Sequence, residues 1–333
     1  MDLVLKNILT QYSKKKANYE FEAEKRKQEI YEKYPKLQDL DNKISSLAIS
    51  TTKALISNND KNLLNELNEN IAKLKEEKNK ILKSLNIDKS FFEPHYDCPI
   101  CKDTGYITNE DYSTSMCNCL KQRLYDEQYN KANISNLDVQ NFDKFTDLLY
   151  SDEINEAKYH TNVSPRENIN LIKNICLDFI KNFDNTEQKN LLFTGNTGLG
   201  KTFLSSCIAN EIIKKGKNVL YQTAPVMLDT IIDYRFGKPN SINILDSILS
   251  ADLLIIDDLG TECINNMKFA ELFNVINTRL LNQNKITKTI ISTNLSLKNL
   301  YSNYDERIIS RIVGNYDICY FYGDDIRFKI RNA

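Results

Sequence analysis

The feature that most constrains this 333-residue chain is a glycine-rich segment past its middle. The pattern G-x-x-x-x-G-K-S/T is matched by Gly195-Asn196-Thr197-Gly198-Leu199-Gly200-Lys201-Thr202, which holds three of the nine glycines in the sequence. An apolar run over 191–193 precedes the segment and a helix-like run over 203–214 follows it, the context that a phosphate-binding loop requires. The alternative, a glycine-rich turn that happens to contain a lysine, does not explain these flanking runs. The sequence therefore predicts nucleotide binding.

The residue types in this loop suit phosphate chemistry. Glycines let successive backbone N–H groups turn toward the phosphates, and the N-terminal end of the following helix adds positive potential. We expect the Lys201 ammonium to neutralise phosphate charge and the Thr202 hydroxyl to ligate Mg²⁺. The predicted cofactors at this segment are ATP and Mg²⁺.

Composition and charge limit the class of protein. Hydrophobic residues make up 41% and charged residues 27%, which is typical of a soluble protein, and the length suggests about two domains. The net charge of -1 argues against a globally basic nucleic-acid binder, although it allows a local basic surface. Lys6 interrupts the apolar start, so no signal peptide is expected, and no run approaches the ~20 apolar residues of a membrane span. We expect a cytoplasmic protein with no membrane partner.

Residues 1–90 have the composition of a helical arm, rich in Lys, Glu, Leu and Asn and without glycine. Apolar residues recur in steps of three and four at Leu37, Leu40, Ile44 and Leu47, and again at Leu64, Leu67, Ile71, Leu74, Ile81 and Leu85. This is heptad spacing, with Lys78 at one seam position, and Pro35 is placed to begin the helix that contains Leu37. We predict a helical hairpin or short coiled coil with its turn at 57–60. Whether the arm is structural or docks a partner stays open.

Four of the eight cysteines lie close together in the sequence. They are Cys98, Cys101, Cys117 and Cys119, which form C-x-x-C and then C-x-C. Disulfides are unexpected beside an ATPase motif, and four thiolates at this spacing suit a tetrahedral Zn²⁺. Because C-x-C is a less usual closing pair than C-x-x-C, His95 is an alternative fourth ligand; unrelated buried cysteines are the other alternative. We predict a structural zinc site in a module over 91–130.

From residue 164 onward, strand-like runs alternate with helix-like runs. We predict strands over 190–194, 218–223, 252–257, 288–293 and 317–322. This alternation is typical of a three-layer α/β domain with a mostly parallel sheet, here over 164–333. The domain starts with a capping box and a proline at the first helical position, Ser164-Pro165-Arg166-Glu167. Residues 131–163 are predicted to be a polar linker, whose Phe142 and Phe145 we expect to pack onto the domain.

The apolar run over 253–256 ends in two carboxylates, Asp257 and Asp258. Behind a phosphate-binding loop this is typical of the Walker B element, whereas alone it would be a buried strand stopped by a turn. We expect Asp257 to hold Mg²⁺ and Asp258 to face the attacking water. The predicted strand over 218–223 lies between the two motifs, as in additional-strand ATPases. Asn294 follows the next strand and is expected to orient water at the γ-phosphate, unless it is only a strand-ending turn residue.

Arg307 and Arg311 lie four residues apart on one face of a predicted helix. An arginine offered to the nucleotide of a neighbouring subunit would stabilise the charge that develops during phosphoryl transfer. The alternative is a solvated pair on a helix surface. The first interpretation predicts self-association across the nucleotide site.

Taken in order, these motifs resemble the AAA+ ATPases of the bacterial helicase-loader type (DnaC/DnaI), close kin of the IstB transposition ATPases. The matching segments are 195–202, 256–262, 292–294, 306–311 and 323–327. The cysteine motif with 103–107 also looks like the N-terminal domain of the DnaI branch. The resemblance implies that Asn294 is sensor 1, Arg311 an arginine finger acting in trans, and Arg327 the sensor 2 arginine. Asp258 stands where most AAA+ proteins carry Glu, and Asp is common there in this subfamily.

The resemblance further implies an ATPase that loads the hexameric replicative DNA helicase under the control of ATP and single-stranded DNA. Aromatic and basic residues mix over 233–238, between two expected helices in 225–250; this suits base stacking and phosphate contact, unless it is an ordinary surface loop. Three alternatives stay open: an IstB-like transposition helper, a nucleotide-dependent adaptor that does not hydrolyse, and a small-molecule P-loop kinase. The zinc module and arm argue against the first, and the extra strand, Asn294 and Arg311 argue against the kinase.

Overall fold

The computed structural model of the chain describes residues 3–57, 61–127, 140–237, 244–263 and 265–331. The chain forms two compact units, divided between Cys117 and Asn118. Among the described residues, no helix is both long enough and apolar enough to cross a membrane. The predicted turn at 57–60 falls mainly on residues outside these ranges.

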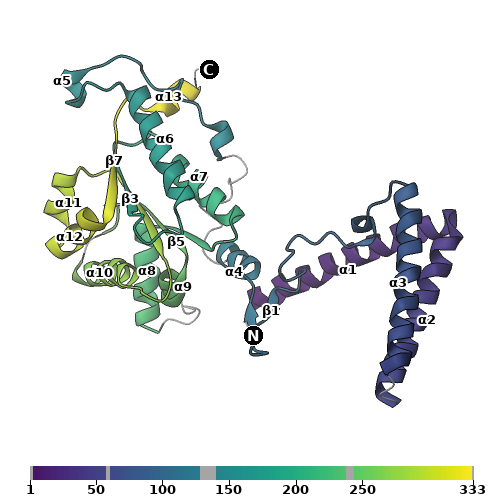
Figure 1. Cartoon of the computed structure of the whole chain (residues 1–333). Helices are drawn as coiled ribbons and strands as arrows, with labels where there is room; N and C mark the ends of the chain where they lie inside the picture. Colours follow the sequence, from purple (N-terminus) through teal and green to yellow (C-terminus); the bar gives the residue numbers. More distant parts are fainter. Residues whose placement is uncertain (1–2, 58–60, 128–139, 238–243, 264, 332–333) are drawn as a thin grey trace. The chain divides into compact units, whose positions relative to one another are not determined.

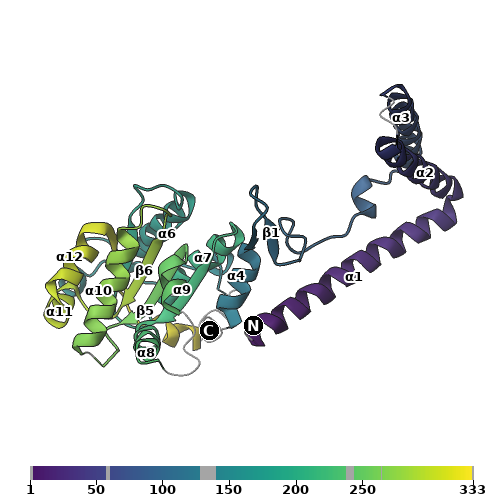
Figure 2. The same ribbon diagram turned by 90° about the horizontal axis from the view of Figure 1, so that it is seen from below.

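The first unit consists of helices and a small hairpin (Figures 1 and 2). Its elements are α1 (Leu3–Lys33), α2 (Pro35–Ser57), α3 (Lys61–Ser84), the 3₁₀ helix η1 (Lys89–Phe92) and the antiparallel strands β1 (Tyr106–Thr108) and β2 (Thr114–Met116). Pro35 begins α2, because its fixed φ and missing N–H suit the first helical position. The two predicted helices are therefore present, and a third, α1, precedes them.

An ion pair explains why a charged residue takes a seam position between α2 and α3. The Nζ of Lys78 lies 2.6 and 2.7 Å from the two carboxylate oxygens of Asp41 on the facing helix. The hydroxyl of Tyr31 on α1 donates to the same carboxylate. Tyr31, Leu37 and Leu82 form the small buried cluster of this unit. All three helices therefore meet around one polar contact and one apolar cluster.

The helical arm and the segment before the cysteines belong to the same unit. Lys15 on α1 places its Nζ 2.6 Å from Oδ2 of Asp97, next to the first cysteine. Arg26, also on α1, donates to the backbone carbonyl oxygens of Phe91 and Glu93, both at 3.0 Å. The main division of the chain consequently falls at 117/118, whereas the boundaries predicted from composition are at 90, 130 and 163.

The second unit is built on a five-stranded parallel sheet with the spatial order β4-β5-β6-β3-β7. Its strands are β3 (Asn190–Gly195), β4 (Val219–Thr223), β5 (Leu253–Leu259), β6 (Lys288–Thr293) and β7 (Tyr316–Phe321). Each lies where the sequence predicts a strand, and the α/β class is confirmed. Strand β6 separates the strand that leads into the glycine-rich loop from the strand that ends in the two aspartates, the order expected of an additional-strand ATPase.

Helices cover both faces of this sheet (Figures 1 and 2). They are α6 (Pro165–Lys181) and α7 (Lys201–Lys214) on one face, and α8 (Ala224–Arg235), α9 (Ile244–Ser250), α10 (Asn266–Leu280), α11 (Leu297–Asn303) and α12 (Glu306–Asn315) on the other. Side chains alternate along the strands: Leu191 and Phe193 join the core with α6 and α7, and Leu192 joins the opposite core. This is the predicted three-layer arrangement.

The first helix of the layered domain starts where its capping signal predicts. The Oγ of Ser164 accepts a hydrogen bond from the backbone N–H of Glu167 at 3.2 Å, and Pro165 takes the first helical position. Satisfying an otherwise unpaired N–H at a helix start stabilises the helix by about 1 kcal/mol.

The edge of the sheet at β4 is covered by helix α4 (Asn118–Tyr125). The side-chain amide of Gln122 donates to the carbonyl oxygen of Val219 at 3.1 Å and accepts from its N–H at 2.7 Å. These two bonds replace the neighbouring strand that an edge strand lacks. Gln122 is a polar residue that packs against the sheet, and its pairing explains its burial.

Residues 140–150, within the predicted linker, pack on the layered domain. The segment includes the short helix η3 (Phe142–Lys144), and Phe142, Phe145 and Leu149 contact the core beneath α6 and α7. The predicted packing of Phe142 and Phe145 is confirmed. Tyr150 is buried in the same core, so this part of the connector belongs structurally to the second unit.

Candidate nucleotide-binding site and metal centre

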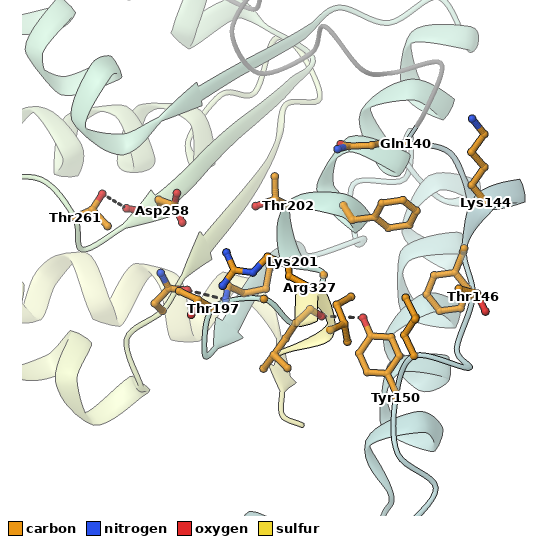
Figure 3. Close-up of a pocket in the computed structure, with 18 residues that line it drawn as sticks. Gln140, Lys144, Thr146, Tyr150, Thr197, Lys201, Thr202, Asp258, Thr261 and Arg327 are labelled. Carbon is orange, nitrogen blue, oxygen red and sulfur yellow. Dashed lines mark hydrogen bonds between the residues drawn. The ribbon is translucent and has the colours of Figure 1, made fainter. Parts of the chain in front are cut away.

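A cavity of about 580 Å³ opens at the carboxyl edge of the parallel sheet. Its wall residues come from the glycine-rich loop, the ends of β5 and β6, helix α13 (Ile326–Arg331) and segment 140–150. Figure 3 shows Asp258 and Thr261 on one side of Thr202, and Thr146 and Tyr150 on the other. The volume and the mixed polar and apolar wall suit a ligand of nucleotide size.

Two glycines of the loop are required by close packing against the C-terminal segment. A Cβ on Gly195 (φ 143°) would lie 2.1 Å from the carbonyl oxygen of Phe321. A Cβ on Gly198 (φ 72°) would lie 1.9 Å from the carboxylate of Asp325. The close atoms at Gly195 belong mainly to the backbone, which cannot move aside, and the positive φ of Gly198 strains a residue that has a side chain. The loop is therefore held beside the segment that carries Arg327.

Lys201 lies at the centre of the site and is almost entirely buried. Its Nζ donates to the carbonyl oxygens of Gly195 at 2.6 Å and Asn196 at 2.7 Å, and to Oδ1 of Asn294 at 2.8 Å. Burial lowers its pKa from 10.5 to about 8, although Asp258 and Asp257 of β5 oppose the shift. Because burial disfavours the charged ammonium, an anionic phosphate that comes close stabilises this charge strongly.

The side chain of Asp257 is buried and hydrogen-bonded on both oxygens. Its Oδ2 accepts from the hydroxyl of Thr202 at 3.1 Å and from that of Tyr221 at 2.7 Å, and the hydroxyl of Ser292 donates to Oδ1. The structure thus brings together the hydroxyl and the carboxylate that the sequence predicts for Mg²⁺. Their oxygen donors fit this hard cation, so Thr202 and Asp257 would hold it beside bound phosphates.

A β-bulge explains how two successive carboxylates reach one site. The register of β5 against β6 shifts between Ile256 and Leu259, so that Asp257 and Asp258 together face a single residue, Ser292. Asp258 has φ of 55°, in the left-handed region that aspartate tolerates better than most residues. Side chains of a regular strand alternate between faces, and the bulge breaks this alternation. As a result, Asp257 contacts the loop while Asp258 lines the cavity.

Two hydroxyls of β6 hold the bulge in place. The hydroxyl of Ser292 donates to Asp257 and accepts from the backbone N–H of Asp258 at 3.1 Å. The hydroxyl of Thr293 donates to the carbonyl oxygen of Leu259 at 2.6 Å. These bonds take the place of ladder hydrogen bonds that the bulge interrupts. The sequence predicts a functional role only for Asn294 in this segment, because a bulge has no clear signal in the sequence.

Asp258 and Asn294 both lie on the cavity wall. Burial, with the charge of Asp257 as the second cause, raises the pKa of Asp258, and Lys201 opposes the shift. A carboxylate with a raised pKa beside a phosphate site is suited to hydrogen-bond and deprotonate water. The two aspartates thus have different surroundings, and the division of roles between them stays a prediction.

The two predicted arginines lie in different places. Arg327 is on the cavity wall, and its Nε is 2.9 and 3.1 Å from the carboxylate oxygens of Asp325. Arg311 does not line the cavity: its Nε donates to Oδ1 of Asn277 on α10 at 3.0 Å, and its guanidinium lies 5.9 Å from the ring centre of Phe273. Arg327 is thus placed to meet a nucleotide in its own subunit, and Arg311 is not.

Tyr150 is a wall residue that the sequence did not reveal. Its hydroxyl donates to the carbonyl oxygen of Leu199 in the loop at 3.0 Å, and burial raises its pKa to about 12. A Cβ on Gly200 would lie 2.7 Å from this hydroxyl. The tyrosine sits in a segment that composition marks as a connector, so only its packing identifies it.

The four clustered cysteines form a group that can hold a metal ion. Their Sγ atoms all lie within 4.8 Å of one another, and those of Cys98 and Cys117 are 3.9 Å apart. Tetrahedral zinc with Zn–S bonds of about 2.3 Å requires S···S distances near ~3.8 Å. The donor set therefore fits Zn²⁺. The group does not include His95, which is exposed.

The turn after Cys101 explains how the first two cysteines face the same point. Lys102 and Asp103 both have positive φ, 49° and 55°, which turns the chain sharply. The buried carboxylate of Asp103 accepts from the backbone N–H groups of Asp97 at 2.9 Å and Cys98 at 2.8 Å. Asp103 therefore fixes the backbone of Cys98 without belonging to the group that could hold a metal, as outer residues of metal sites commonly do.

Comparison with known proteins agrees with this site. A family profile described as IstB-like ATP binding protein matches residues 108–332. The chain belongs to this family. Within the matched range lie the glycine-rich loop, both aspartates, Asn294 and the two arginines.

Individual relatives include replicative helicase loaders. The chain is 24% identical to the replicative helicase loader DnaC of Escherichia coli (strain K12) over 154 residues, 46% of this chain and 61% of that protein. It is 28% identical to DnaC of Buchnera aphidicola subsp. Baizongia pistaciae (strain Bp) over 156 residues, 46% of this chain and 62% of that protein. The chain thus spans about three-fifths of the length of these curated relatives. An ATP-binding protein of insertion sequence IS1162 from Pseudomonas fluorescens is 30% identical over 97 residues, 28% of this chain and 40% of that protein.

Solved structures that align with this chain include one of DnaC and one of DnaI. A crystal structure of the DnaC helicase loader aligns with a TM-score of 0.41 and 25% identity over 51% of this chain and 97% of that chain. A crystal structure of DnaI aligns with a TM-score of 0.40 and 21% identity over 55% of this chain and 95% of that chain.

Proposed function

We propose that this protein is an ATP-dependent loader of the replicative DNA helicase. The observation that carries the proposal is the convergence of Lys201, the Thr202–Asp257 pair, Asp258 and Asn294 on one cavity. The similarity to DnaC favours helicase loading as the function of this ATP site. Together with the family match, it argues against a small-molecule kinase.

In the proposed hydrolysis, each side chain of the site has a distinct role. Lys201 neutralises the phosphates, and its amide partner Asn294 turns to the attacking water once a phosphate takes the ammonium. Asp258 accepts a proton from that water as the water oxygen attacks the γ-phosphorus and ADP leaves. Asp257 and Thr202 would hold Mg²⁺, which would neutralise phosphate charge when bound. Arg327 adds positive charge from α13. Arg311 reaches only the nucleotide of a neighbouring subunit, so full activity needs self-association.

The partner surfaces of this proposal lie outside the cavity. The helical arm and cysteine cluster bind the hexameric helicase, and the end of α8 contacts single-stranded DNA. Phe236 there is 67% exposed and available for stacking, whereas Arg235 is bound to the carboxylate of Glu271 at 2.9 and 3.3 Å. Of the predicted segment over 233–238, Lys238 lies outside the described residues.

A second candidate is a transposition helper ATPase, which the similarity to the IS1162 protein favours. The arm and the cysteine cluster ahead of the ATPase unit favour the loader instead. A non-hydrolysing adaptor is the remaining candidate. ATP turnover with and without single-stranded DNA separates it from both.

The test is a loading assay with the full chain and the hexameric replicative helicase of the same organism. We expect the protein to co-elute with the helicase and to increase the amount of helicase on circular single-stranded DNA when ATP is present. Lys201→Ala should lose the increase in loading that ATP causes. Lys181→Ala, which changes an exposed lysine of α6, should keep this increase. No association with the helicase, together with stimulation of a transposase, would favour the helper instead.

A further inference from the structure

A buried carboxylate lies just beyond the aspartates of the nucleotide site. Glu262 is only 7% exposed, and its Oε2 accepts from the backbone N–H of Gly260 at 2.9 Å. Gly260 has φ of 104°, and a Cβ there would lie 2.6 Å from the side chain of Leu295. The hydroxyl of Thr261 donates to the carbonyl oxygen of Asp258 at 2.8 Å. Glu262 thus closes a tight turn, 258–262, whose first residue lines the cavity.

The second oxygen of Glu262 binds a distant residue. The hydroxyl of Tyr304 donates to Oε1 of Glu262, and Tyr304 is 5% exposed. Tyr304 follows α11 and directly precedes Asp305, the N-cap of α12. Its ring packs edge-on against Phe269 of α10, with ring centres 5.7 Å apart. The turn after β5 is therefore joined, by one side-chain pair, to the start of α12.

Helix α12 carries the two arginines that the cavity does not use. Arg307 and Arg311 lie with their guanidinium groups 5.4 and 5.9 Å from the ring centre of Phe273 on α10. Arg307 is also bound to Asp305, whereas Arg311 is held by Asn277. Moving the start of α12 against α10 would therefore move Arg311 directly, since fewer than two helical turns separate Tyr304 from it.

We propose that the Glu262–Tyr304 pair is a positioning link, through which the nucleotide site of one subunit sets the place of the arginine that the subunit offers to its neighbour. The proposal rests on Arg311 acting in trans. A change at Asp258 on hydrolysis shifts the turn over 258–262, and the buried pair passes the shift to α12. Neither Glu262 nor Tyr304 lines the cavity, so both act through other residues.

The experiment measures how well one chain supplies its arginine to another. The receiving chain is Arg311→Ala, with an intact loop, and the donor is Lys201→Ala, with an intact arginine. Mixing them should restore ATP turnover. We expect a donor that also carries Tyr304→Phe to restore about fivefold less turnover, because one hydrogen bond to a buried group is lost. A donor with Tyr301→Phe, a neighbouring exposed tyrosine on α11, serves as the matched control and should restore it fully.

A second pair of donors keeps the proposal testable if Tyr304→Phe lowers stability. Glu262→Gln keeps the shape and an acceptor oxygen and should retain most donor activity, whereas Glu262→Ala should lose it as Tyr304→Phe does. Thermal unfolding and co-assembly are measured for each donor. If the Tyr304→Phe and Tyr301→Phe donors restore turnover equally, the Glu262–Tyr304 pair does not position Arg311. The action of Arg311 in trans would not be contradicted by that result. Absence of restoration by the parental Lys201→Ala donor, in chains shown to co-assemble, would overturn the trans arginine and the link with it.

Discussion

At the scale of single residues, the site depends on buried charges held close together. Lys201, Asp257 and Asp258 lie within one small region, and each is partly or wholly removed from water. Burial lowers the pKa of Lys201 and raises that of Asp258, while attraction between the lysine and this carboxylate opposes both shifts. Ser292 holds the backbone that aims the two carboxylates in different directions. The resulting balance makes the site responsive to a phosphate and a divalent cation.

The first prediction concerns the two aspartates and the loop lysine. Asp258→Asn should lower the rate of ATP turnover by about 10²-fold or more with little change in ATP affinity, since proton acceptance is lost while phosphate contacts remain. Lys201→Ala should weaken ATP binding itself. Turnover and fluorescent-nucleotide binding measured on both variants distinguish these outcomes. Parental turnover in Asp258→Asn would show that the roles of the two aspartates are wrongly assigned.

The second prediction concerns pH. The pKa of Lys201 is lowered to about 8 in the free protein, and phosphates favour the charged form, so ATP binding raises this pKa again. Affinity for ATP should therefore be highest below about pH 8 and fall as pH rises above it, by at most about tenfold per pH unit.

In the free protein the same shift makes the free energy of unfolding rise between about pH 8 and 10.5, because the unfolded chain holds the proton more tightly.

Nucleotide binding measured from pH 7 to about 10 checks this expectation. Lys201→Met, which has no titrating group at this position, is the control and should bind weakly with a flat profile above about pH 8. A flat profile in the unaltered protein would mean that Lys201 keeps its charge throughout this range.

At the scale of elements, one irregularity in a strand organises the second unit. The bulge at the end of β5 brings both aspartates to the site, and the turn beyond it places Glu262 against Tyr304. Helix α10 then carries Phe273 and Asn277, which hold Arg311. The strand that carries the two aspartates and the helix that holds Arg311 are thus consecutive elements, and both contribute to one core.

The third prediction concerns the cysteine cluster. Protein purified without chelators should contain one zinc ion per chain, and Cys98→Ser or Cys117→Ser should lose it. The segment around the cluster has little apolar core, so metal loss should increase its proteolysis and amide exchange. Elemental analysis and exchange measurements test this, with Cys263→Ser, an exposed cysteine outside the cluster, as the control. Absence of zinc from the unaltered protein would contradict the structural zinc site.

At the scale of the whole molecule, activity is expected to require more than one chain. The cavity of one subunit contains Arg327 but not Arg311, although both arginines belong to the same unit. Charge that develops during phosphoryl transfer therefore lacks one expected cation until a second subunit supplies it. We therefore expect turnover to depend on assembly.

The fourth prediction tests that coupling. Arg311→Ala should lower turnover by about 10³-fold with little change in ATP affinity, the scale typical of arginines supplied across an interface. Turnover per chain should rise with protein concentration in the unaltered protein. Arg307→Ala, one helical turn earlier on the same face, is the matched control and should have a much smaller effect. An unchanged rate of turnover in Arg311→Ala would contradict a role for this arginine in hydrolysis.

The sequence by itself determined the parallel α/β class, the five strands, the start of α2 and the phosphate-binding loop. Each of these depends on local spacing, such as an apolar run before a glycine-rich turn, or a proline that begins a helix. The cysteine spacing likewise predicted which four thiols would meet. Such features can be recognised in short segments, because the residues that make them are neighbours in the chain.

Only the tertiary structure decided the bulge at Asp257–Asp258, the role of Ser292, the burial of Tyr150 and the Glu262–Tyr304 pair. Each of these depends on atoms brought together from distant parts of the chain, as Tyr304 is to Glu262 across 42 residues. The same holds for the pKa of Lys201, which burial sets more than any neighbour in sequence. Long-range packing, hydrogen bonding and desolvation act between residues whose separation along the chain carries no pattern, so these features appear only in the folded protein.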